Sequence, residues 1–154
     1  MAKTVFIQLD MEVLSKIRLD FFDGLDENSE EILKKLPLPQ EVIEILKFSN
    51  GLHLFEDEFE GIALGGSVCL IYSAEEIIES YHRICTITSE VNLIPILRLR
   101  DLGEICIDID KYKKGENYLT YPGMEMDKYF KCSYLKWLEY FIITSGNNFW
   151  EWNY

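Results

Sequence analysis

The chain has little of what most catalytic and metal-binding sites require. Its 154 residues include two histidines, His53 and His82, and neither belongs to a His-Glu-x-x-His pattern or to a cluster with cysteine. The sequence contains no Cys-x-x-Cys pair, no nucleophile elbow, no P-loop and no dinucleotide-binding fingerprint. We therefore expect no catalytic residue, no metal site and no cofactor, and we do not classify the chain as an enzyme.

Long apolar runs are missing as well. No stretch approaches the roughly 20 residues of a membrane-spanning helix, and the apolar stretch at the N-terminus is too short for a secretory signal peptide. The cysteines are widely spaced among apolar neighbours, which is typical of buried free thiols in a reducing compartment. They are Cys69, Cys85, Cys106 and Cys132. The sequence thus predicts a cytoplasmic protein without membrane association.

What the chain does have is enough apolar residues for a hydrophobic core. They make up 48% of the sequence, and the length suits one domain over residues 1–154. Gly65-Gly66-Ser67 is expected to form a tight turn between two short strands. Short apolar runs predict antiparallel strands at residues 52–55, 61–64, 68–72, 93–99, 104–110 and 117–121. The predicted class is α+β, with a largely antiparallel sheet of about five to six strands and helices packed against it.

Apolar residues at helical spacing predict helices near both ends of the chain. A short helix has Ser29 as its expected N-cap, and Ser73 with Glu76 forms a capping box that predicts the start of a central helix. The C-terminal helix is expected to start near Ser133 and to end at Gly146. The N-terminal helix is predicted from Met11, Leu14, Ile17 and Phe21.

The chain ends in an aromatic segment at residues 149–154. Four aromatic side chains in six residues are costly to leave in water, so we expect the segment to fold back onto the core. The alternative is an exposed anchor for a partner, because aromatic residues dominate binding hot spots.

Two carboxylates form the strongest candidate for catalysis or metal binding. Asp108 and Asp110 alternate with isoleucines on a predicted strand, which places them on one face about 6–7 Å apart. That spacing suits a divalent metal or an acid/base pair in a small hydrolase. No third ligand or glycine-rich loop accompanies them, so we interpret them as solvated carboxylates on a half-exposed strand.

The charge of the chain is uneven. The net charge is −12, and residues 48–82 contain seven acidic residues and no Lys or Arg. A concentrated negative field repels nucleic acid and favours a basic protein partner. The alternative is an ordinary solvated surface that keeps the protein soluble. From the charge pattern we predict four partner-binding residues, Glu56, Asp57, Glu58 and Glu60.

One stretch of the chain resembles a known family. Leu36-Pro37, an apolar helix starting at Pro39, and the closing pair Asn50-Gly51 together resemble the opening signature of the SUKH superfamily. Its members include bacterial immunity proteins and fungal cell-wall-assembly regulators. Further segments follow in the family's order at residues 61–64, 68–78, 93–97, 103–108 and 133–138. The resemblance covers roughly residues 36–143, and the chain departs from the family's pattern at Arg98 and Arg100.

The resemblance implies a non-catalytic immunity protein of a polymorphic toxin system. Such a protein binds and neutralises a cognate toxin, frequently a nuclease, by steric and electrostatic blockade. The acidic segment supports this independently, because nuclease surfaces that hold phosphates are basic. Family members vary their binding surface on a shared scaffold, so no functional residue transfers by motif. The alternative is a regulatory scaffold that docks cellular proteins, as the fungal members are thought to do.

Overall fold

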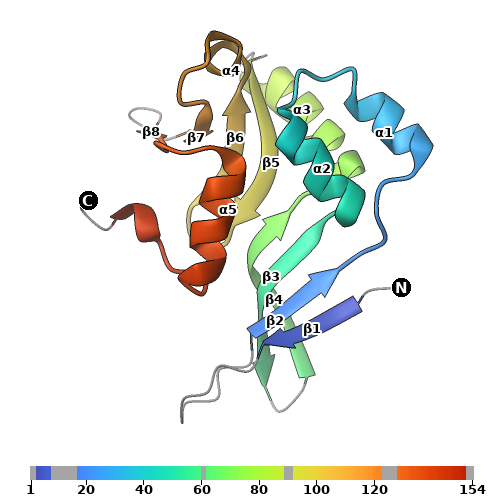
Figure 1. The fold of residues 1–154 in the computed structure, drawn as a ribbon, viewed down its shortest axis with the longest axis vertical. Helices are drawn as coiled ribbons and strands as arrows, with labels where there is room; N and C mark the ends of the chain where they lie inside the picture. Colours follow the sequence, from blue (N-terminus) through green and yellow to red (C-terminus); the bar gives the residue numbers. More distant parts are fainter. Residues whose placement is uncertain (1–2, 8–16, 60–61, 89–91, 123–127, 152–154) are drawn as a thin grey trace.

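The computed structural model describes residues 3–7, 17–59, 62–88, 92–122 and 128–151 (Figure 1). In these residues, eight strands form one sheet whose order in space follows their order in the sequence, and all neighbouring strands are antiparallel. Helices pack against this sheet, which confirms the predicted α+β class. The sheet exceeds the expected five to six strands because strands also form near both ends of the chain.

The strands are β1 (Lys3–Ile7), β2 (Ile17–Phe21), β3 (Leu52–Phe59), β4 (Ile62–Ile71), β5 (Leu93–Leu99), β6 (Gly103–Asp108), β7 (Leu119–Tyr121) and β8 (Lys128–Tyr129). The α-helices are α1 (Glu27–Leu33), α2 (Gln40–Phe48), α3 (Ala74–Thr88), α4 (Ile109–Lys114) and α5 (Tyr134–Ile143). A short 3-10 helix, η1, spans Phe149–Glu151.

The predicted N-terminal helix is wrong where the structure describes it. Ile17 and Phe21 lie in β2, which pairs with β1 on one side and with β3 on the other. Pairing with two neighbours supplies hydrogen bonds that local helical spacing does not reveal, so tertiary context overrides the local pattern. The other two residues of the predicted helix, Met11 and Leu14, lie outside the described residues.

Two local predictions elsewhere are also wrong. The N-cap of α1 is Asp26, whose carboxylate accepts the N–H of Ser29 at 2.7 Å, so Ser29 lies inside the helix. Gly65-Gly66-Ser67 forms no turn and lies within β4, where Ser67 pairs with Glu56 of β3. β3 continues to Phe59 and offers backbone partners along this stretch, so the two strands predicted there are one.

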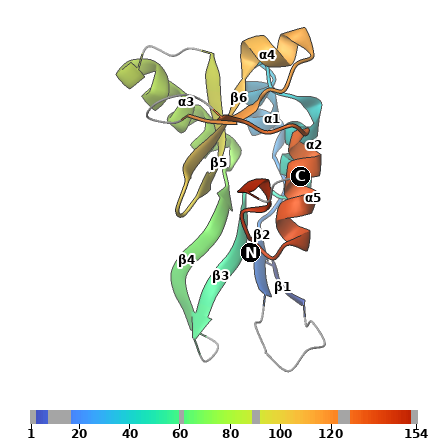
Figure 2. The same ribbon diagram turned by 90° about the vertical axis from the view of Figure 1, so that its left-hand side faces the viewer.

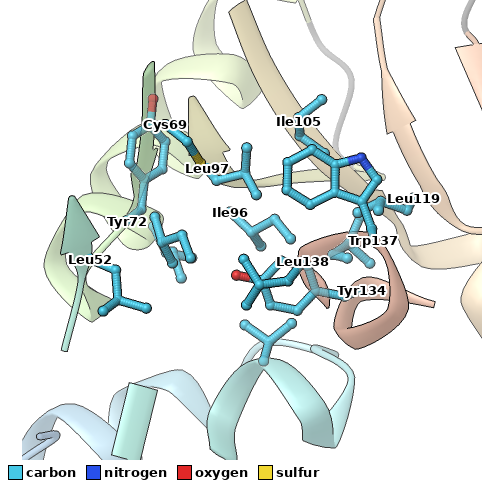
Figure 3. Close-up of a cluster of buried hydrophobic side chains, with 14 of the residues drawn as sticks. Leu52, Cys69, Tyr72, Ile96, Leu97, Ile105, Leu119, Tyr134, Trp137 and Leu138 are labelled. Atoms are coloured by element: carbon cyan, nitrogen blue, oxygen red, sulfur yellow. The ribbon is translucent and has the colours of Figure 1, made fainter. Parts of the chain in front are cut away.

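The core lies around the middle strands. β5 is buried at every position except Arg98, so both faces of the sheet are covered there. Figure 2 shows α3 and α5 on opposite sides of β5 and β6. Tyr134 and Trp137 of α5 are fully buried in this core and lie close to Ile96 (Figure 3). The central and C-terminal helices predicted from their capping residues are thereby confirmed as α3 and α5.

The aromatic segment folds back onto the core as far as the structure describes it. Trp150 stacks on Trp137 with ring centroids 5.8 Å apart and meets the ring of Phe130 edge-on at 5.3 Å. Phe149 also packs against the core cluster. The predicted back-folding is confirmed for Phe149 and Trp150, whereas residues 152–154 lie outside the described part.

Candidate functional site

Three of the four predicted partner-binding residues lie on one strand. Glu56, Asp57 and Glu58 belong to the second half of β3, and Glu60 lies outside the described residues. The register between β3 and β4 shifts between Glu56 and Glu58, which marks a bulge or irregularity in the ladder. This half of the β3–β4 pair extends beyond the helices, in the lower part of Figure 2. The backbone of Glu56, Asp57 and Glu58 therefore lies in a projecting part of the sheet.

The first half of the same strand contributes to an apolar groove. The groove has a volume of about 310 Å³, with strands β2 and β3 on one side and helices α2 and α5 on the others. Glu44 is the one charged residue among the described residues that line it. The lining consists of Leu19, Phe21, Glu44, Ile45, Phe48, Leu52, Leu54, Leu138 and Ile142.

Two of these residues leave a large apolar area in water. Phe48, the last residue of α2, has 72% of its surface exposed, although its ring meets Phe21 edge-on with centroids 5.5 Å apart. Ile142 near the end of α5 is 36% exposed, and the adjacent Ile143 is 69% exposed. Exposed apolar residues scattered singly are ordinary, but neighbours that border a groove are typical of a protein-binding surface.

The sequence builds this surface because α5 has more apolar residues than the core accepts. Tyr134, Trp137 and Phe141 fill the buried face of the helix. Ile142 and Ile143 extend the apolar surface beyond that face. We did not predict the groove from the sequence, although two signals were present: an aromatic residue ending α2 and an Ile-Ile pair after a complete core face.

Two acidic residues of α3, Glu75 and Glu76, make local hydrogen bonds. The Glu75 carboxylate accepts hydrogen bonds from the hydroxyl of Ser29 at 2.9 Å and from the side-chain amide of Asn50 at 3.3 Å. A hydrogen bond from its own backbone N–H, together with these two, lowers the pKa of Glu75. Glu76 accepts the N–H of Ser73 at 2.8 Å, which confirms the predicted capping box.

The predicted carboxylate pair does not share a strand face. Asp108 ends β6 and caps α4, where it accepts the N–H of Lys111 at 3.0 Å and the hydroxyl of Tyr129 at 2.7 Å. Asp110 lies within α4 and accepts the side-chain amide of Asn92 at 2.8 Å. Strand β6 ends at Asp108, and α4 begins at the next residue. Asp108 and Asp110 therefore do not lie two residues apart on one strand, as the sequence predicted. Among the described residues, no group of three or more His, Cys, Asp and Glu side chains is placed to hold a metal ion.

The histidines and cysteines have structural surroundings. The ring of His53 packs edge-on against Phe22 at 5.0 Å, and His82 is exposed on α3 beside Tyr81. All four cysteines are free thiols. Cys69 and Cys106 are buried as predicted, whereas Cys85 and Cys132 are partly exposed. Burial raises the pKa of the Cys69 thiol, which keeps it protonated and unreactive.

A second hollow has a volume of about 430 Å³, and the one cationic side chain among its described lining residues already has partners within the lining. It is lined by Lys111, Gly115, Glu116, Asn117 and Tyr129. The Lys111 ammonium lies 4.2 Å from the centre of the Tyr129 ring and 3.6 Å from the Glu116 carboxylate. Its charge already has partners, so this hollow is a weaker candidate for a binding site than the apolar groove.

Comparison with known proteins finds a relative in a bacterium. The chain is 33% identical over 147 residues to a protein of Bacillus subtilis (strain 168) described as uncharacterized protein YobM. The alignment covers 94% of this chain and 78% of the relative. No family model matches the sequence, and no solved structure matches the fold. No helix in the described part of the chain has the length and apolar character needed to span a membrane.

Proposed function

We propose that this chain, which belongs to the same family as YobM of Bacillus subtilis, is an immunity protein that binds and neutralises a cognate protein toxin. The observation that carries the proposal is the composition of β3. This strand lines an apolar groove with Leu52 and Leu54 and then continues as Glu56, Asp57 and Glu58. The resemblance of residues 36–143 to the SUKH superfamily supports the same function.

The proposed mechanism is blockade without chemistry. The toxin is a nuclease whose phosphate-binding surface is basic, and the acidic half of β3 occupies that surface in place of nucleic acid. The net charge of −12 steers a basic partner towards the protein over distances longer than direct contact. Apolar contacts in the groove then hold the complex together. We place this action in the cytoplasm, where a nuclease toxin would reach its substrate.

The character of the groove supports a protein partner over a small substrate. Sites for small molecules usually combine apolar walls with several convergent polar groups that orient the ligand. In this groove the described lining offers one carboxylate, that of Glu44, and this group already accepts a hydrogen bond from Gln40 at 2.6 Å. Direct binding of nucleic acid is opposed by the negative charge.

A growth assay tests the proposal. The protein is co-expressed with the toxin encoded by the neighbouring open reading frame, and we expect it to restore growth. Glu56→Lys combined with Glu58→Lys should weaken protection, because the change places positive charge against a basic partner. The matched control is Glu31→Lys combined with Glu79→Lys. This variant changes the net charge by the same amount as the test variant, but its substitutions lie on α1 and α3 instead of β3.

Each outcome of this assay has a separate meaning. Failure of the unchanged protein to protect cells would contradict the proposed function. Equal protection by the two double variants would contradict the acidic site and leave the function standing. If the protein does not protect cells and a separate pull-down recovers several host proteins with it, the docking scaffold would be favoured instead.

A further inference from the structure

The apolar groove has short walls. Helix α2 lines it with Glu44, Ile45 and Phe48, and α5 lines it with Leu138 and Ile142. The outermost lining residues on each helix are four positions apart, so each wall is about 6 Å long at 1.5 Å of rise per residue. A partner helix anchored at positions i, i+4 and i+7 would span about 10 Å. The groove therefore fits one large side chain better than a docked helix.

The lining of the groove favours an aromatic side chain. Leu19, Leu52 and Leu54 line the strand side and are buried. Phe21 and Phe48 meet edge-on beside them with ring centroids 5.5 Å apart. Because Phe48 is 72% exposed, most of its ring surface is open to a third ring. Aromatic pairs gain free energy beyond the apolar area that they bury, so an aromatic occupant gains more here than an aliphatic one.

The groove is bordered by a carboxylate with an available oxygen. The Oε1 atom of Glu44 accepts the side-chain amide of Gln40 at 2.6 Å and lies 3.8 Å from the ammonium of Lys47. That ammonium lies closer to Glu30, at 3.1 Å. The Oε2 atom of Glu44 accepts no hydrogen bond from the residues that the structure describes. Since Phe48 follows Glu44 by one helical turn, a cation between them would contact a carboxylate and an aromatic ring.

Charge complementarity decides which occupant this arrangement fits. A second copy of the chain would bring another net charge of −12 towards the same carboxylate. A basic protein is attracted by that field and supplies the cation that Glu44 can accept. The groove beside Glu44 requires that the same protein also present an aromatic side chain.

We infer that the groove receives an anchor of the toxin that consists of one aromatic side chain with a Lys or Arg beside it. The aromatic ring enters between α2 and α5, and the cation lies against the Glu44 carboxylate and the Phe48 ring. This inference rests on the proposed function, since it describes the chemistry by which the toxin contacts this surface.

A random peptide library displayed on phage tests the inference without any toxin. The purified protein should enrich peptides that carry an aromatic residue next to Lys or Arg. Binding of a synthetic enriched peptide should weaken about tenfold in Ile142→Ser, because the substitution removes apolar contact from the groove. Selection on Glu44→Gln should keep the preference for an aromatic residue and lose the preference for a basic one.

The chain supplies a close control for each substitution. Ile32 of α1 is 37% exposed and Ile142 is 36% exposed, so Ile32→Ser makes the same chemical change at equal exposure. The Glu139 side chain is 53% exposed against 59% for Glu44, and each has a lysine three positions away. Neither Ile32 nor Glu139 lines the groove, so Ile32→Ser and Glu139→Gln should leave peptide binding unchanged. Thermal unfolding followed by circular dichroism shows whether each variant remains folded.

Several results would overturn the inference. Enriched peptides without the aromatic and basic pair would do so, as would an empty selection or peptide binding that survives Ile142→Ser. A dimer in sedimentation equilibrium that Ile142→Ser dissociates would show that a second copy fills the groove. In the growth assay, full protection by Ile142→Ser would overturn the anchor and leave the proposed function intact, whereas no protection by the unchanged protein would overturn the function.

Discussion

Glu41 of α2 accepts a hydrogen bond of 2.8 Å from the backbone N–H of Tyr134, the first residue of α5. The same carboxylate oxygen also accepts the hydroxyl of Tyr118. Burial, followed by the bond to Glu41, raises the pKa of the Tyr118 hydroxyl, which therefore stays a donor. These bonds join the starts of α2 and α5, the two helices that border the apolar groove.

Removing the Glu41 carboxylate should destabilise the fold. Glu41→Ala leaves the hydroxyl of the half-buried Tyr118 without its acceptor and leaves the Tyr134 N–H only the Tyr118 oxygen at 3.1 Å, which costs about 1–3 kcal/mol of unfolding free energy. Glu139→Ala removes a carboxylate from an exposed pair with Lys136 and should cost less than about 1 kcal/mol. Urea denaturation measures both values. Equal losses would show that the bond between α2 and α5 adds nothing to stability.

Gly146→Ala should lower the free energy of unfolding more than Gly115→Ala does. Both glycines follow a helix with positive φ, +82° and +71°, so either substitution to alanine carries the cost of a left-handed backbone. The new Cβ at residue 146 would lie 2.9 Å from Cδ2 of Phe55, whereas residue 115 has open space. Gly146→Ala should therefore lose roughly 1–3 kcal/mol more in urea denaturation. Equal losses would mean that Phe55 moves aside freely.

The aromatic segment at the C-terminus should contribute to stability. Trp150→Ala removes ring contacts with Trp137 and Phe130 and should cost about 1–3 kcal/mol, below the value for a fully buried tryptophan. Trp150→Phe keeps an aromatic ring and removes an indole N–H that is buried without a hydrogen-bond partner among the described residues, so it should cost less. Melting temperatures compare the two variants. An unchanged melting temperature after deletion of residues 149–154 would contradict this role.

Stability at acid pH should depend on Glu75. Its hydrogen bonds lower the pKa of the folded carboxyl below the ordinary value of 4.5, so the folded state favours the ionised form. The resulting stability is present above about pH 4.5 and is lost as the pH falls through the folded pKa. Glu75→Gln should therefore give a shallower decline of melting temperature with acidification. Glu79→Gln on the same helix is the control, and identical acid profiles for both variants would contradict the linkage.

Elements with local capping signals could be predicted from the sequence. Ser73 with Glu76 predicted the start of α3, and Ser133 predicted the start of α5, because a cap depends on residues within one turn. β2 could not be predicted in the same way. Its five residues form a strand because β1 and β3 pair with it, and that pairing depends on distant parts of the chain.

The acidic half of the candidate site could be predicted and the groove could not. The absence of Lys and Arg from residues 48–82 is visible in the sequence. The groove requires Phe48 of α2 and Ile142 of α5 to border the same stretch of β3, and only the packing of the two helices brings them together. Separately, each residue is an ordinary exposed apolar side chain.

Direct titration of the purified protein with the toxin from the neighbouring open reading frame tests the central proposal. Calorimetry should show a one-to-one complex that inhibits the toxin. Its affinity should fall when salt is raised to about 1 M, where the screening length shrinks to about 3 Å. The decrease should be smaller for Glu56→Lys combined with Glu58→Lys. Absence of binding, or a complex in which the toxin stays fully active, would contradict the proposed function.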